Sequence, residues 1–316
     1  MPDFPKKYFN FITRRGLVCG VLGLGLTSCL GSFQVVHLHN APSYENVDSD
    51  EEIKKVTFAH LNAADLRGNT TNLFQFISKE EAEQRAASLA DFTRKEKIGI
   101  FTFNELDYAG TAKTGGFDQP KIIAEFAGSP HNYVVVDQYM KSPLWTTGNA
   151  IISSFPVKIE YRHLYGNQEC ELDSRLGHLF KDFIHVKVKV GKRELDVITT
   201  HLDDADGEFS FRRHEEAREL ADYVTELKQK NPYSYIVAAG DFNDSYNSKT
   251  MKILLSSRIL HPPAENFGLK THQNGNPSKD LDHILASGNI VIHNYKTFTF
   301  PWSDHLGLMC ELEFLY

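Results

Sequence analysis

Apolar runs of strand length alternate with amphipathic segments along most of the chain, from about residue 53 to residue 316. Helical spacing of apolar residues predicts helices over 79–96, 119–126 and 215–228. Shorter apolar runs predict strands over 56–62, 98–105, 133–139, 150–153, 183–190, 195–200, 235–239, 281–286, 291–300 and 308–314. Because no repeat and no internal linker interrupts this alternation, it predicts one α/β domain over residues 53–316.

The first 52 residues have a different pattern. Basic residues precede an apolar, glycine-rich stretch at 17–26, and Leu26-Thr27-Ser28-Cys29 closes it. This layout is typical of a secretory signal, and its last four residues resemble the bacterial lipobox, whose cysteine is lipidated. We therefore predict a signal peptide over residues 1–28, lipidation at Cys29 and a polar tether over residues 29–52.

An uncleaved membrane anchor is the alternative interpretation of this segment. Its strongly apolar part is shorter than the ~20 residues of a spanning helix, and Gln34, His37 and His39 interrupt its extension. The lipoprotein interpretation predicts an exported bacterial protein. It would be held on a membrane by its lipid and would face the periplasm or the cell surface.

The charge balance restricts the class of partner. The 316 residues include 34 Lys and Arg against 41 Asp and Glu, a net charge of −7. This balance argues against a protein that coats nucleic acid by bulk charge, but an enzyme that reaches phosphates through a metal ion remains compatible with it. Beyond the N-terminal segment, Cys170 and Cys310 could pair, although Cys310 lies in an apolar run that favours a buried thiol.

Polar residues gather where predicted strands begin or end. The positions are Asn62, Asn104-Glu105, Thr200-His201, Gly240-Asp241-Phe242-Asn243, Asp282-His283 and Ser303-Asp304-His305. Side chains just beyond buried strands are held rigidly and can converge at one rim of a sheet. Oxygen ligands from Glu, Asp and Asn suit Mg²⁺ or Mn²⁺, whereas no Cys/His spacing suggests structural zinc.

In this order, N…NE…GNAIISSFP…THLD…GDFN…LDHIL…SDH, the motifs resemble the endonuclease/exonuclease/phosphatase superfamily. The resemblance spans about residues 56–316. It implies the deoxyribonuclease I-like fold, a four-layer α/β sandwich with two central mixed sheets flanked by helices. It also implies a divalent-metal-dependent phosphoester hydrolase, with a phosphodiesterase as the expected type, in which an activated water attacks a metal-bound phosphate in line.

By position, the resemblance assigns three residues to the metal, with Mg²⁺ expected and Mn²⁺ as the alternative: Asn62, Glu105 and Asp304. It assigns five residues to catalysis: His201, Asp241, Asn243, Asp282 and His305. Asp241 and Asn243 would position and activate the water, and His305 would be the catalytic histidine with Asp282 as its carboxylate partner. His201 would contact the scissile phosphate.

Three departures from the family pattern bear on the substrate. Asn104 replaces a common Gln, Ser154 replaces a cation, and Lys181 stands where many members have Arg. The substrate is therefore left open between nucleic acid and a small phosphodiester or phospholipid headgroup. A catalytically silent binding module is a further alternative. No obligate protein partner is inferred, and Arg212-Arg213 is expected to be surface charge on a helix.

Overall fold

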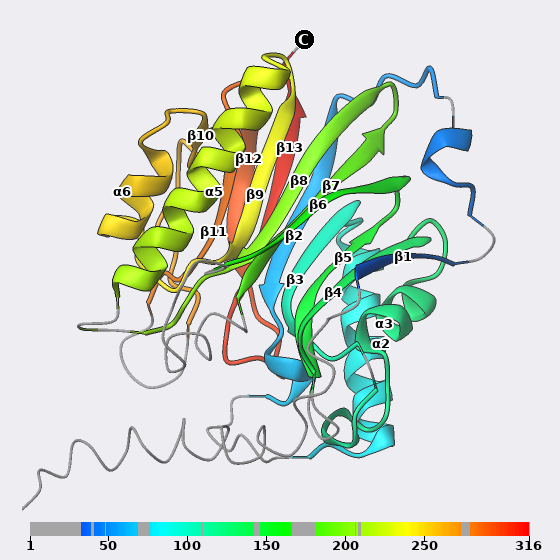
Figure 1. Cartoon of the computed structure of the whole chain (residues 1–316). Coiled ribbons are helices and arrows are strands. Elements are labelled where there is room, and N and C mark those ends of the chain that lie inside the picture. Colours follow the sequence, from blue (N-terminus) through cyan, green and yellow to red (C-terminus); the bar gives the residue numbers. More distant parts are fainter. Residues whose placement is uncertain are drawn as a thin grey trace, which may run out of the picture.

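A computed structural model describes residues 33–315, except 39–40, 48, 69–75, 109, 142–145, 166–180, 206, 208–209 and 273–278. The predicted signal peptide, Cys29 and Cys170 lie outside these residues. Two β-sheets pack face to face at the centre of the molecule, with helices on their outer sides (Figure 1). Among the described residues, no helix is long and apolar enough to cross a membrane.

The first sheet has seven strands in the order β1-β4-β5-β3-β2-β13-β12. Their bounds are β1 Phe33–His37, β2 Lys55–Asn62, β3 Ile100–Leu106, β4 Tyr133–Lys141, β5 Thr146–Ser153, β12 Ile290–Phe298 and β13 Gly307–Phe314. Only β2 and β3 pair in parallel among these described strands.

The second sheet has six strands in the order β10-β11-β9-β8-β7-β6. Their bounds are β6 Val157–Leu164, β7 Asp182–Val190, β8 Arg193–His201, β9 Tyr235–Asp241, β10 Leu260–His261 and β11 Asp282–Ser287. Here β8 and β9 form the parallel pair, so each sheet is mixed.

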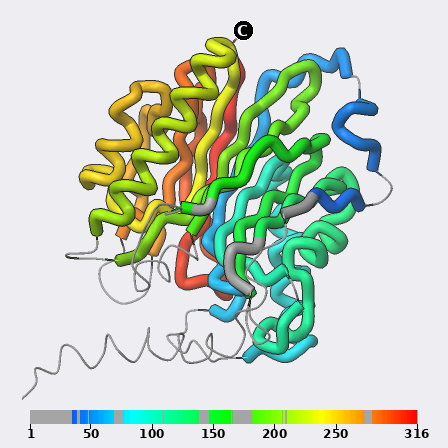
Figure 2. The backbone as a smooth tube through the Cα atoms, viewed as in Figure 1, coloured from blue at the N-terminus to red at the C-terminus, as the bar shows by residue number. Residues whose placement is uncertain are grey.

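In the described part of the chain, four α-helices cover the outer faces: α2 Lys79–Lys95, α3 Gln119–Ala127, α5 Phe211–Lys230 and α6 Lys249–Leu255. Apolar residues of α2 and α3 pack on the first sheet, and those of α5 and α6 pack on the second. The two helix pairs flank opposite sides of the strands in the tube view (Figure 2). Short 3-10 helices η1 Tyr44–Asn46, η2 Ala64–Leu66 and η3 Ala112–Thr114 complete the described elements.

The largest apolar core lies between the two sheets. It joins inward-facing residues such as Phe58, Ile100 and Ile151 of the first sheet to Ile184, Val197 and Val237 of the second. Burying each such side chain stabilises the fold by roughly 1.5–3 kcal/mol relative to exposure. With the helices outside, this core gives four layers, and the predicted four-layer α/β sandwich is confirmed.

Two described elements lie within residues 29–52, the segment expected to be a polar tether. Residues Phe33–His37 form β1, which pairs with β4 as an edge strand. Tyr44 is buried, and its hydroxyl donates to Glu194. The polar residues around these positions did not suggest either contact. A five-residue edge strand such as β1 needs only one neighbouring strand with free backbone groups, so it leaves little pattern in the sequence. The sequence also did not predict β6, α6 and β10.

Candidate active site

Strand ends from both sheets meet at one edge of the sandwich. Within the first sheet, Asn62 at the end of β2 is in register with Asn104 of β3. Within the second sheet, Asp241 at the end of β9 is in register with His201 of β8 and with Asp282 of β11. Because the sheets pack face to face, these polar ends become neighbours, and a hydrogen bond of 3.0 Å from Asn62 Nδ2 to Asp241 Oδ2 joins them.

Glu105 occupies an irregular position in β3. The pairing of β3 with β5 shifts register between Phe103 and Leu106, and Glu105 has a φ of +54°. Such a bulge redirects side chains that would otherwise alternate strictly between the two faces of a sheet. As a result, Asn62 Nδ2 donates to Glu105 Oε1 at 3.3 Å, and His201 Nε2 lies 3.8 Å from the same oxygen. The Glu105 side chain keeps 31% of its surface exposed, so it is accessible to a ligand.

The Ser-Asp-His segment is tied to the end of β2. Ser303 Oγ donates to the backbone oxygen of Asn62 at 2.6 Å and accepts from the backbone N–H of His305 at 2.9 Å. Asp304, between these two residues, is half-buried. Its charge acts on both Glu105 and His305. The three residues predicted to hold a metal therefore share one neighbourhood.

Their chemistry fits a divalent cation. Asn62, Glu105 and Asp304 offer the hard oxygen donors that Mg²⁺ and Mn²⁺ prefer. Asp241, Asp282 and His305 also present ligand atoms within 4.8 Å of one another. Burial, together with the nearby Asp282, raises the pKa of Asp241. A cation would offset this concentration of buried negative charge.

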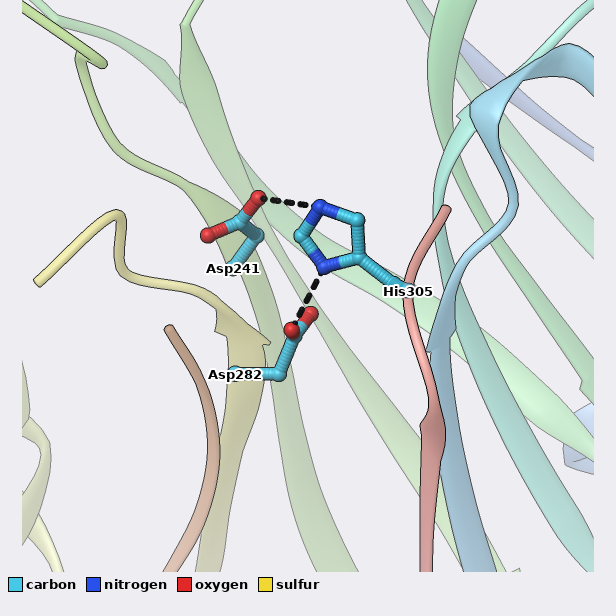
Figure 3. A group of neighbouring side chains, drawn as sticks. All are labelled: Asp241, Asp282 and His305. Atoms are coloured by element: carbon cyan, nitrogen blue, oxygen red, sulfur yellow. Dashed lines mark hydrogen bonds and ion pairs between the residues drawn. The ribbon is translucent and has the colours of Figure 1, made fainter. Parts of the chain in front are cut away.

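His305 and Asp282 form a buried dyad (Figure 3). His305 Nδ1 lies 2.7 Å from Asp282 Oδ2, while Nε2 faces Asp241 Oδ2 at 3.8 Å. Burial alone would lower the pKa of His305, but the charge of Asp282 and its hydrogen bond outweigh burial and raise that pKa to about 10. Burial would likewise raise the pKa of Asp282, but His305 and His60 hold it below its usual value.

His60 is a neighbour of this dyad that sequence reasoning missed. It is fully buried in β2, and its Nε2 lies 3.3 Å from Asp282 Oδ1. Its Nδ1 lies 3.0 Å from Thr102 Oγ1. The alternation of side chains along a strand could have indicated His60, because it is two residues before Asn62 and therefore faces the same side of β2.

His201 lies on the other side of Asp241. Its Nε2 is 3.7 Å from Asp241 Oδ2 and 2.5 Å from Lys181 Nζ. Burial and the positive charge of Lys181 lower the pKa of His201 well below its ordinary value. At neutral pH His201 is therefore uncharged, and Lys181 carries the positive charge at this point of the site.

Local backbone geometry places Asp241 and Asn243. Asp241 Oδ1 accepts from the backbone N–H of Asn243 at 2.8 Å in an Asx turn, and Asn243 has a φ of +52°. Asn243 Nδ2 donates to the backbone oxygen of Leu202 at 2.8 Å. A side chain at Gly240 would place Cβ 2.0 Å from the Thr200 oxygen. Glycine is thus required where β8 and β9 approach beside the site.

The expectation that Arg212 and Arg213 are surface charge on a helix is wrong. Both are buried, with 3% and 4% exposure, and are not surface charge on a helix. Arg213 Nη1 donates to the backbone oxygen of Asp203 at 2.9 Å, and Arg213 Nε lies 3.4 Å from Asp244 Oδ2. The first turn of α5 thereby holds the loops that follow His201 and Asn243, which helical periodicity alone could not indicate.

The sequence matches the profile of the Endonuclease/Exonuclease/phosphatase family over residues 61–305. The chain belongs to this family. Family members are phosphoester hydrolases that depend on divalent metal ions, so the protein is an enzyme of the phosphoester hydrolase class. None of the curated proteins matches the sequence.

Solved structures with the same fold are distant in sequence. An endonuclease/exonuclease/phosphatase from Beutenbergia cavernae has a TM-score of 0.63 at 16% identity, covering 83% of this chain and 72% of that one. A mannosyl-6-phosphatase from Bacteroides thetaiotaomicron has a TM-score of 0.56 at 16% identity, covering 82% and 100%. The human Nocturnin catalytic domain has a TM-score of 0.57 at 16% identity, covering 90% and 97%. At this identity the likeness bears on the fold alone.

Proposed function

We propose that the protein is a divalent-metal-dependent phosphodiesterase that acts outside the cytoplasm, anchored to a membrane by a lipid on Cys29. The observation that carries the hydrolytic part is the buried line Asp282–His305–Asp241, with His305 Nδ1 at 2.7 Å from Asp282 and Nε2 at 3.8 Å from Asp241. Such a line fixes the imidazole and aims one nitrogen at a second acid, as acid–base chemistry at phosphorus requires.

Asn62, Glu105 and Asp304 would hold the metal, Mg²⁺ or Mn²⁺. When bound, the metal neutralises phosphate oxygens and so lowers the barrier to attack by water. Asp241 and Asn243 would align that water, with Asp241 accepting its proton. His305, charged at neutral pH, would face the phosphate through Nε2 and stabilise negative charge that develops there.

The region beside His201 would receive the phosphate group. Lys181 supplies its positive charge at 2.5 Å from His201 Nε2, and both side chains are buried. A buried ammonium binds phosphate as a point charge without the bidentate geometry of arginine. This local charge lies within a chain of net charge −7, which favours a small phosphodiester over a long nucleic acid.

The export proposal rests on the basic and apolar segments before Leu26-Thr27-Ser28-Cys29. Incorporation of a fatty acid label into the full chain, with accumulation of the uncleaved precursor when lipoprotein signal peptidase is inhibited, would test this part separately from catalysis.

The full chain, purified in mild detergent, would be assayed on bis(4-nitrophenyl) phosphate, 4-nitrophenyl phosphate and plasmid DNA, each with Mg²⁺, with Mn²⁺ and with chelator. We expect metal-dependent hydrolysis that is fastest on the diester. Faster cleavage of DNA would replace the small-diester proposal with a nuclease. A folded, metal-loaded protein that is inactive on all three would contradict the phosphodiesterase proposal.

A further inference from the structure

A line of buried hydrogen bonds runs beneath the candidate active site from one sheet to the other and back. The backbone N–H of Asp241 in β9 donates to Asn104 Oδ1 at 2.8 Å. Asn104 Nδ2 in β3 donates to Asn149 Oδ1 in β5, and Asn149 Nδ2 donates to Asp182 Oδ1 in β7. These four residues are each 2% exposed or less, so water does not compete for their polar groups.

The groups at both ends of this line determine which atom of each amide donates and which accepts. The Asp241 end is an N–H group, which can only donate, so Asn104 must present its oxygen there and its NH₂ group to Asn149. At the other end, Asp182 Oδ1 accepts from the NH₂ group of Asn149. Each amide therefore has one orientation that satisfies both of its neighbours, and rotating either one breaks two hydrogen bonds.

The Asp182 end is anchored by a second buried acid. Asp182 hydrogen-bonds to Asp137 of β4, and both side chains face Arg162 of β6. Arg162 Nε lies 2.6 Å from Asp137 Oδ1 and 3.6 Å from Asp182 Oδ2. One guanidinium cannot balance two buried carboxylates, so the pair retains a proton. Burial and the charge of Asp137 raise the pKa of Asp182 well above its usual value, and burial also raises the pKa of Asp137.

We propose that Asn149 and Asp182 are positioning residues that hold Asp241 in its working place through Asn104. The proposal rests on the function proposed above, because it gives Asp241 its role in aligning water. It also explains the shortened residue before Glu105. Asn104 has one methylene fewer than Gln, and its NH₂ group donates to Asn149 of the neighbouring strand, which carries the line on to Asp182 in the second sheet.

The direction of the hydrogen bonds predicts how substitutions should differ. Asp182 shares the retained proton with Asp137 and accepts from Asn149. An amide at position 182 can both donate to Asp137 and accept from Asn149. Asp182→Asn should therefore retain the line, whereas Asp182→Ala and Asn149→Ala should break it. A catalytic group displaced by about 1 Å loses on the order of 100-fold in rate.

The test measures kcat and KM of the full chain on bis(4-nitrophenyl) phosphate with Mg²⁺, together with the melting temperature of each variant. We expect Asn149→Ala and Asp182→Ala to lower kcat by about 10- to 100-fold with KM nearly unchanged, and Asp182→Asn to stay within about threefold of the wild type. Ser287→Ala is the matched control. Ser287 is a buried side chain at the far end of β11 that accepts from the Ile236 N–H at 2.9 Å, so its loss should lower stability and not kcat.

Wild-type kcat in Asn149→Ala, or a kcat in Asp182→Asn as low as that in Asp182→Ala, would overturn the proposal. If Asn149→Ala does not fold, Asn149→Leu, which keeps the side-chain volume, takes its place. Hydrogen exchange at the Asp241 amide gives a readout independent of turnover. Faster exchange there in the Asn149 variant supports the proposal even if the wild type proves inactive on this substrate, and unchanged exchange contradicts it.

Discussion

Replacing Asp282 by Asn should collapse the proton affinity of His305. In the wild type, the Asp282 carboxylate lies 2.7 Å from Nδ1 and raises the pKa of His305 to about 10 from an ordinary 6.5. This gap corresponds to about 5 kcal/mol in favour of the imidazolium, at about 1.4 kcal/mol for each tenfold change in proton affinity. In the variant the carboxylate charge is gone and burial remains, so the pKa should fall to 6.5 or below.

The sign of the effect on stability follows from the same shift. His305 has a raised pKa in the folded state, so its contribution is complete below about pH 6.5 and is lost as the pH rises through about 10. Asp282 has a lowered pKa, so its contribution is present above its usual titration range and is lost as the pH falls. Metal-free wild type should therefore lose stability between pH 7 and pH 10, and Asp282→Asn should lose much less over that interval.

The assay is an NMR titration of the histidine side chains in metal-free protein, with urea unfolding at several pH values. Asp280→Asn is the control, because Asp280 accepts from the Tyr246 N–H at 3.0 Å and does not contact the His305 ring in any described interaction. A His305 that titrates near 6.5 in the wild type, or near 10 in Asp282→Asn, would refute this reasoning.

Three further expectations concern other parts of the chain. Glu105→Gln should raise the Mg²⁺ concentration for half-maximal activity by at least about tenfold, measured by metal titration; an unchanged value would remove Glu105 from the metal site. Gly240→Ala should lower the free energy of unfolding by about 1–3 kcal/mol or more, because its Cβ would meet the Thr200 oxygen at 2.0 Å; equal stability in urea would show that β8 and β9 can separate freely. Cys29→Ala should abolish lipid labelling and membrane association, whereas labelling that persists would place the lipid elsewhere.

Much of the fold could be predicted because the apolar pattern agrees with the local signals. The helix expected over 79–96 begins where Ser78 Oγ accepts from the Glu81 N–H at 3.2 Å, in a capping box that is visible in the sequence. The strands that carry Asn62, Asp241 and Asp282 run close to their expected bounds. The edge strand β1 was missed because five residues carry too little periodicity to stand out from a polar surrounding.

The candidate site could be predicted as a set of strand ends but not as a set of contacts. Register brings His201, Asp241 and Asp282 together within the second sheet, and strand order is invisible in a single sequence. The bulge that turns Glu105 towards Asn62 has no local sequence signal. The contacts of His60 and Arg213 were missed for a related reason. His60 meets Asp282, more than two hundred residues later, and Arg213 meets Asp203, about ten residues earlier, and in both cases only the packing of the fold joins the two residues.

The most direct test of hydrolysis at this site compares the wild type with Asp241→Asn on bis(4-nitrophenyl) phosphate, with Mg²⁺ and again after chelation. Asn at this position keeps the shape of Asp241 and removes its ability to accept a proton from water. If the site works as proposed, the wild type releases nitrophenolate only with metal, and the folded variant is slower by about 100-fold or more. Equal rates in both proteins, or release that survives chelation, would contradict catalysis by Asp241 at a metal-dependent site.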